Sequence, residues 1–145
     1  GSQPGELAAF RLGQTLYEEE EYEEAREAFA AFAEKYSQSR HVPDARLGRA
    51  YAMEAAGDVA RAAEIFVAAA DAAEGSFQAA EAWVGAGRCA AATNDREAAR
   101  RYYENAISTA AEGMFVDRAT EALQQLADSG SVSPGDKEPV NAQTD

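Results

Sequence analysis

Cysteine and histidine are almost missing from this chain of 145 residues, which contains one of each. A single cysteine cannot form an internal disulfide, so the cysteine count leaves the redox compartment open. The sequence also lacks a glycine-rich phosphate loop, a Cys-x-x-Cys pair and a His-Glu-x-x-His motif. We therefore predict that the protein is not an enzyme and that it uses no cofactor and no metal.

Long apolar runs and basic residues are also scarce. No apolar stretch approaches the roughly 18 residues that suggest a membrane-spanning helix, so we predict no direct membrane insertion by this segment. Lys and Arg number 13 against 26 Asp and Glu, which gives a formal net charge of -13. Phosphate binding needs clustered Lys and Arg, so nucleic acid and anionic membranes are not expected partners. A protein or peptide is the expected partner, and a homo-oligomer stays open.

Val, Ile and Thr are sparse, whereas Ala is abundant, and this balance favours helix over strand. Small and aromatic residues recur in three copies at a spacing of 37 residues. The recurring sets are Gly13, Ala50 and Gly87; Ala25, Ala62 and Ala99; Phe29, Phe66 and Tyr103; and Phe32, Ala69 and Ala106. Four positions that repeat at one period indicate a helical repeat protein.

The third copy shows why this spacing suits a packed helix pair. Trp83 and Gly87 share one helix face, and the missing side chain of Gly87 lets a partner helix approach. Asn94 and Asp95 form a turn, because Asn tolerates the left-handed conformation and Asp can cap the next helix. The pattern resembles the tetratricopeptide repeat (TPR) family over residues 6–128, with units slightly longer than the usual length of about 34 residues. We expect Trp83 to be largely buried.

The resemblance implies an all-α, TPR-like right-handed solenoid of three helix pairs plus one C-terminal capping helix. A tag remnant and lead at 1–5 precede the TPR domain, and a disordered tail is expected at 129–145, where proline, glycine and polar residues predominate. Asp58 can cap the fourth helix. The repeats are expected at about 6–42, 43–79 and 80–116, with the cap at 114–128. The helices are expected at 6–19, 22–36, 44–56, 59–73, 77–93, 96–110 and 114–128.

Three isolated features have both a functional and a structural interpretation. His41 is interpreted as an ordinary surface histidine rather than a catalytic or metal-binding group. Cys89 lies among small residues with no basic cluster nearby, so we expect a buried small hydrophobic residue rather than a reactive thiol. Residues 18–24 hold six glutamates around Tyr22, but they lack the Asp, Asn and Gly alternation of a calcium loop. We interpret them as a solvated turn with acids at a helix start.

The TPR resemblance also implies a binding groove on the concave face, which the first helix of each pair lines. Matching the repeats places there Leu7, Phe10, Gln14 and Tyr17; Asp44, Leu47, Tyr51 and Glu54; and Glu81, Val84, Arg88 and Ala91. We predict a partner-binding groove made of Leu7, Phe10, Arg11, Gln14, Tyr17, Leu47, Tyr51, Val84 and Arg88. Tyr51 is expected to anchor the partner and to matter little for the fold. Arg11 and Arg88 are expected to favour a ligand that carries carboxylates.

Two departures from the family pattern matter. TPR proteins that hold a C-terminal carboxylate of chaperones use a Lys, Asn and Arg clamp, whereas Phe10 and Gln14 stand at two of those positions here. That role is therefore not expected. In the second repeat, arginines occupy places where bulky apolar residues are usual. The phase of this repeat stays open between the 37-residue register and one shifted by two, in which Leu47 and Gly48 form the pair.

The connection after the second helix, Tyr36-Ser37-Gln38-Ser39, resembles the Tyr-Pro-x-Ser connection of bacterial envelope TPR proteins, with Ser37 in place of the proline. Those proteins include BamD-like lipoproteins, CpoB-like Tol–Pal proteins and YfgM-like translocon accessory proteins. The resemblance favours the periplasmic side of a bacterial membrane, with the cytoplasm as the alternative. Two functions stay open: a non-enzymatic adaptor that binds a peptide or protein segment in the groove, in envelope assembly or secretion, and a self-associating structural or assembly scaffold.

Overall fold

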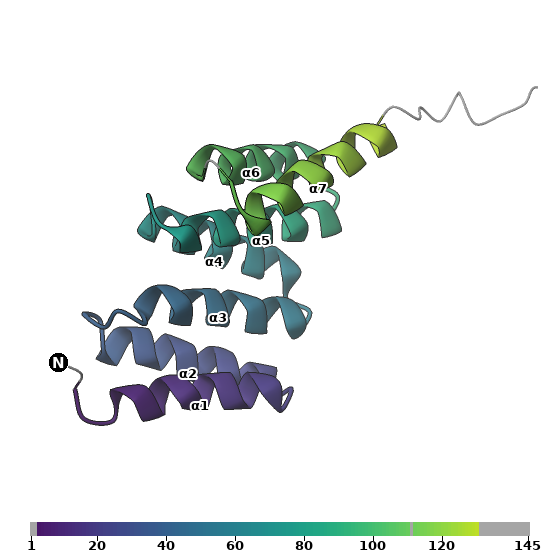
Figure 1. Ribbon diagram of the computed structural model, residues 1–145. Helices are drawn as coiled ribbons and strands as arrows, with labels where there is room; N and C mark the ends of the chain where they lie inside the picture. The colour runs from purple at the N-terminus through teal and green to yellow at the C-terminus, as the bar shows by residue number, and fades with distance from the viewer. Residues whose placement is uncertain (1–2, 111, 131–145) are drawn as a thin grey trace, which may run out of the picture.

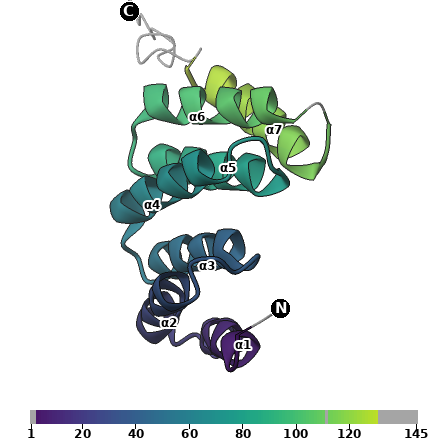
Figure 2. The same cartoon turned by 90° about the vertical axis from the view of Figure 1, so that its left-hand side faces the viewer.

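The computed structural model describes residues 3–110 and 112–130, and this part of the chain contains seven α-helices and no strand. Successive helices run back and forth and stack in chain order, from α1 at one end to α6 and α7 at the other (Figures 1 and 2). The helices are α1 (Glu6–Glu18), α2 (Tyr22–Lys35), α3 (Val42–Ala55), α4 (Val59–Ala72), α5 (Phe77–Ala92), α6 (Arg96–Thr109) and α7 (Met114–Gly130). The predicted all-α, TPR-like helical repeat is confirmed.

The expected helices agree with the observed ones to within two residues at every end. Helix α3 begins earlier than expected, at Val42, with a proline in its first turn, where a missing N–H removes no helical hydrogen bond. Helix α7 packs on α5 and α6 and continues through Gly130. Residues 131–145, which make up most of the expected tail, lie outside the described residues.

A left-handed residue stands in the middle of the turn within each helix pair, again at the 37-residue spacing. These residues are Glu20, Gly57 and Asn94, with φ of 63°, 92° and 63°. Glycine carries no steric penalty there and Asn a small one, whereas Glu is strained. The chain therefore turns at the same repeat position each time, although only Gly57 is suited to the conformation without cost.

Replacing Glu20 with glycine should raise the free energy of unfolding by about 1 kcal/mol, because the left-handed strain of a residue with a Cβ is removed. The matched control is Glu19→Gly, which makes the same change in charge at a residue with φ of -81°. This control should bring no such gain. Urea unfolding followed by circular dichroism measures both, and equal effects would show that charge rather than backbone conformation sets the result.

The two aspartates expected as helix caps behave differently. The carboxylate of Asp95 accepts a hydrogen bond from the backbone N–H of Ala98, at 3.1 Å, and so caps α6 as predicted. Asp58 occupies the residue before α4, but its carboxylate makes no cap hydrogen bond. It lies instead 4.0 Å from Arg26 and 3.9 Å from Arg61. The predicted Asp58 cap is wrong, and the carboxylate lies near two guanidinium groups instead.

Aromatic rings of the second helices lie against glycines of the first helices. The Phe29 ring is held between Gly13 of α1 and Gly48 of α3, and a Cβ added to either glycine would lie 2.7 Å from ring atoms. Gly85 faces the Phe66 ring and Gly87 faces the Tyr103 ring, with corresponding distances of 2.5 Å. The predicted close approach at Gly87 is confirmed. Glycine therefore sets the spacing both within and between helix pairs.

These contacts settle the phase of the second repeat. Ala50 is buried in one cluster with Phe66, so it stands in the 37-residue register as Gly13 and Gly87 do. Gly48 faces Phe29 of the preceding pair, and Gly85 repeats this contact with Phe66 37 residues later. Gly48, two residues before Ala50, therefore marks a second packing contact, between successive helix pairs. It does not indicate a different alignment of the second repeat.

Trp83 is buried in part, and two other aromatic side chains are buried more deeply. Its indole is half-buried and stacks on the Tyr102 ring, with centroids 5.7 Å apart. The fully buried aromatic side chains are instead Phe32 and Phe66. The indole packs against both of the core clusters to which α5 contributes.

The first inter-repeat connection is attached to the start of α1. The buried Tyr36 hydroxyl donates to the carbonyl of Pro4 at 3.3 Å, and the Ser39 hydroxyl donates to the Glu6 carboxylate. Glu6 also accepts from the backbone N–H of Gln3 at 3.0 Å. The hydrogen bond from Ser39, followed by that from Gln3, lowers the pKa of Glu6. Tyr36 and Ser39 thus have a structural role in the connection.

Candidate functional site: a groove across the first two repeats

A groove of about 670 Å³ runs along α1 and α3 and reaches the beginning of α5. Phe29 of α2 also lines it. The residues that line it are Phe10, Gln14, Tyr17, Glu18, Phe29, His41, Asp44, Leu47, Gly48, Tyr51 and Glu81. A space of this size can hold several side chains of an extended or helical segment, in the volume range of ligand sites.

The floor of the groove is apolar and aromatic. Phe10, Phe29 and Leu47 are buried, and the Phe10 and Phe29 rings meet edge to face with centroids 6.1 Å apart. The His41 imidazole stacks on the Phe10 ring at 4.9 Å, with an angle of 19° between the planes. Tyr17 is half-buried at the side of the groove. These rigid rings can bury a partner side chain with little loss of conformational entropy.

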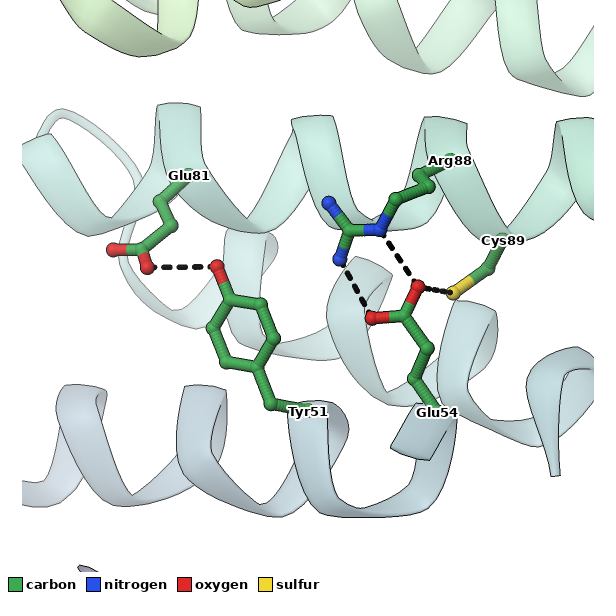
Figure 3. Close-up of polar contacts among 5 residues, drawn as sticks. All are labelled: Tyr51, Glu54, Glu81, Arg88 and Cys89. Atoms are coloured by element: carbon green, nitrogen blue, oxygen red, sulfur yellow. Dashed lines mark hydrogen bonds and ion pairs between the residues drawn. The ribbon is translucent and has the colours of Figure 1, made fainter. Parts of the chain in front are cut away.

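The charged groups of the groove are all acidic. Glu18, Asp44 and Glu81 come from three different helices, and no lysine or arginine lines the groove among the described residues. Glu18 and Asp44 are exposed, whereas Glu81 is half-buried. The Tyr51 hydroxyl donates to Glu81 Oε1 at 2.8 Å (Figure 3). Burial, with this hydrogen bond as the second cause, raises the pKa of Tyr51, so its hydroxyl stays protonated.

Arg88 is paired within the protein and does not line the groove. Its Nε and Nη2 donate to the two carboxylate oxygens of Glu54, both at 2.7 Å, so α5 and α3 are joined by a two-point ion pair (Figure 3). The hydrogen bond to Glu54 raises the pKa of Arg88. The guanidinium also lies 5.8 Å from the centroids of the Tyr51 and Phe66 rings. These contacts commit two of the guanidinium nitrogens to Glu54, while the side chain stays 43% exposed.

Cys89 is fully buried beside the same ion pair. Its thiol donates to Glu54 Oε2 at 3.5 Å. Burial, followed by the Glu54 charge, raises the pKa of Cys89 to about 12. Because the thiolate is the reactive form of cysteine, this agrees with the interpretation of Cys89 as a buried structural residue.

Of the nine predicted groove residues, the structure brings five together and leaves four outside. The five that line the groove are Phe10, Gln14, Tyr17, Leu47 and Tyr51. Leu7 and Arg11 are exposed on α1 away from the lining, and Arg88 is paired with Glu54. Val84 is buried in the cluster that α5, α6 and α7 share. The third repeat contributes little to the groove because its first helix is covered by the following elements.

Tyr51 has a larger structural role than expected. Its ring meets the fully buried Phe66 ring edge to face, with centroids 5.1 Å apart, and its hydroxyl bonds Glu81 on the next first helix. Replacing it with alanine would therefore disturb both the core and the groove. The prediction that Tyr51 matters little for the fold is wrong, because the side chain lies between two repeats.

Six lining residues were not among the nine predicted: Glu18, Phe29, His41, Asp44, Gly48 and Glu81. Asp44 and Glu81 stand at repeat positions that had been matched to the concave face, but they were left out of the predicted groove. Phe29 and Gly48 could have been found from the aromatic–glycine spacing, since their contact forms the floor. His41 precedes α3 by one residue, and its stacking on Phe10 depends on how the α2–α3 connection folds back. Glu18 is one residue from Tyr17 and carried no separate signal among the neighbouring glutamates.

The described residues form neither a metal-holding group nor a membrane-spanning helix. No group of three or more His, Cys, Asp and Glu side chains among them is placed to hold a metal ion. None of the described helices is long and apolar enough to cross a membrane.

The fold and the groove together define a helical repeat protein with an open aromatic surface. The tetratricopeptide repeat family model matches residues 10–77, from within α1 to the first residue of α5. The match supports a TPR protein, and it covers the two helix pairs that form most of the groove. Repeats of this family mediate protein–protein interactions, and the family is in general non-enzymatic. No match to this chain was found among curated proteins.

Proposed function

We propose that this protein is a non-enzymatic interaction adaptor that binds a peptide or protein segment in the groove of its first two repeats. The observation that carries the proposal is the aromatic floor of Phe10, Phe29 and Leu47 under an open space of about 670 Å³. The family match over residues 10–77 supports it, because the matched segment supplies nearly all of the lining.

A photo-cross-linker placed at Gln14 tests this adaptor function in cells that express the full-length protein. Gln14 is exposed and lines the groove, so the probe should capture one partner protein, and mass spectrometry should map the cross-link to one segment of it. The matched control carries the probe at Gln125, an exposed glutamine of α7 outside the groove. Capture of the same segment from Gln125 and not from Gln14 would contradict the groove as the binding surface.

We also propose a place in bacterial envelope assembly or secretion, on the periplasmic side of the membrane. The support is the resemblance of the Tyr36–Ser39 connection to envelope TPR proteins of the BamD-like, CpoB-like and YfgM-like kind. Fractionation of native cells checks this. Recovery of the full-length protein in the periplasmic or membrane fraction is expected, and recovery in the cytoplasm alone would contradict it.

A second candidate function is self-association as an assembly scaffold. It is favoured by the exposure of Leu7 and Leu12 on α1, at the open end of the stack, with 48% and 54% of their surface accessible. Sedimentation equilibrium at several concentrations distinguishes the two functions. A monomer throughout supports the adaptor, whereas a dimer that Leu12→Glu dissociates supports the scaffold.

A further inference from the structure

We infer that the groove selects a basic, apolar segment: a partner peptide that places a Lys or Arg against Glu18, Asp44 and Glu81 and an apolar side chain on the Phe10 floor. This inference rests on the proposed adaptor function and adds the chemistry of the partner to it. It also reverses the preference expected from Arg11 and Arg88, since neither arginine lines the groove.

The charges around the groove support a cationic partner. Three carboxylates from α1, α3 and α5 surround one apolar floor, and the nearby guanidinium of Arg88 is occupied by Glu54 through two hydrogen bonds of 2.7 Å. The chain as a whole carries a net charge of -13. An acidic peptide would meet like charges at the site and over the surface, whereas a basic peptide is attracted over roughly the Debye length of 8–10 Å.

The geometry of the groove also suits long basic side chains. Lys and Arg bury their methylene stems on apolar surface while the charged group remains near water, and the rings of Phe10, Tyr17 and Tyr51 offer such a surface. Aromatic faces also attract cations directly. The hydrogen bond from Tyr51 occupies Oε1 of Glu81 and holds this carboxylate at the groove, with Oε2 available to a cation (Figure 3).

The first test uses random peptides displayed on phage and selected on the immobilised full-length chain. Enriched sequences should combine Lys or Arg with an aromatic or aliphatic residue. A fluorescent copy of one enriched peptide is then compared with a copy in which Glu replaces every Lys and Arg. Fluorescence anisotropy should show binding at least about ten-fold weaker for the acidic copy, which is about 1.4 kcal/mol. Binding of the basic copy should also weaken as salt is added.

The second test changes the groove. The double variant Glu18→Gln with Asp44→Asn removes one exposed carboxylate from a last helical turn and one from a first turn. The matched control, Glu34→Gln with Asp117→Asn, does the same at exposed positions of α2 and α7 outside the groove. The groove variant should bind the basic peptide about ten-fold more weakly and the control less than about two-fold, since each exposed ion pair changes affinity by up to about five-fold. Thermal melts should show both variants folded.

The outcomes separate this inference from the adaptor proposal. If selected peptides cross-link to the probe at Gln14 but are acidic or neutral, or bind the groove variant and its control equally, the basic specificity is wrong and the adaptor function stands. If no peptide is enriched, or enriched peptides cross-link only at Gln125, both proposals are overturned. If the chain dimerises and the dimer excludes the peptide, the groove is occupied by a second copy and the basic partner is rejected.

Discussion

Replacing Phe66 with alanine should lower the free energy of unfolding by about 3–5 kcal/mol, through lost burial and the cavity that remains. Phe66 is 0% exposed, and it packs against Gly85 of α5 and edge to face on Tyr51 of α3. The side chain therefore contacts the first helix of its own repeat and the first helix of the next repeat. Because backbone atoms of Gly85 lie close to the ring, the helices cannot collapse far into the space. Urea unfolding followed by circular dichroism measures the loss.

The control for Phe66→Ala is Phe77→Ala, the same substitution at a ring that is 66% exposed. Phe77 contacts Phe115 on one side, with centroids 5.6 Å apart, so its removal should cost about 1 kcal/mol or less. Comparable losses for the two variants would mean that Phe66 does not join the second and third repeats. A change in the denaturant slope would mean that the repeats unfold separately, which a solenoid with weakened neighbour contacts can do.

Replacing Gly48 with alanine should lower the free energy of unfolding by about 1–3 kcal/mol, the range for overpacking in a filled core. The direction of this change in the free energy of unfolding is informative, because Gly→Ala inside a helix is otherwise stabilising by about 1 kcal/mol. The added Cβ would lie 2.7 Å from the Phe29 ring, whose opposite edge is already against Gly13. The ring cannot move away, so the helices α2 and α3 must separate.

A second substitution checks the cause of the Gly48→Ala effect. Phe29→Leu removes part of the ring, so the double variant should be more stable than the sum of the two single effects predicts. Thermal or urea unfolding of the four proteins completes the cycle. An increase in stability for Gly48→Ala alone would show that the contact between α2 and α3 has room for a Cβ. The close packing of Gly48 on Phe29 would then not set the distance between α1 and α3 across the groove.

The sequence could predict the groove only in part, and Arg88 shows why. Its repeat position correctly assigned it to the first helix of a pair, but that position does not state which partner the side chain meets. The guanidinium pairs with Glu54, which stands 34 residues earlier and on the preceding first helix. The same limit applies to Val84, which the cap and α6 bury. The net charge of the side chains that line the groove could therefore not be predicted from repeat positions alone.

The sequence by itself determined the helical repeat, its 37-residue period, the helix ends and the glycines at the helix contacts. These properties depend on local backbone preference and on side-chain size at fixed spacing, and both are carried by neighbouring residues in the chain. Only the tertiary structure decided that Phe32 and Phe66 are buried more deeply than Trp83 and that Tyr51 joins two repeats. It also decided that, among the described residues, carboxylates line the groove and the two expected arginines do not. Those outcomes depend on which side chains from different helices reach one another, because a charge or a ring changes its role when a distant residue pairs with it.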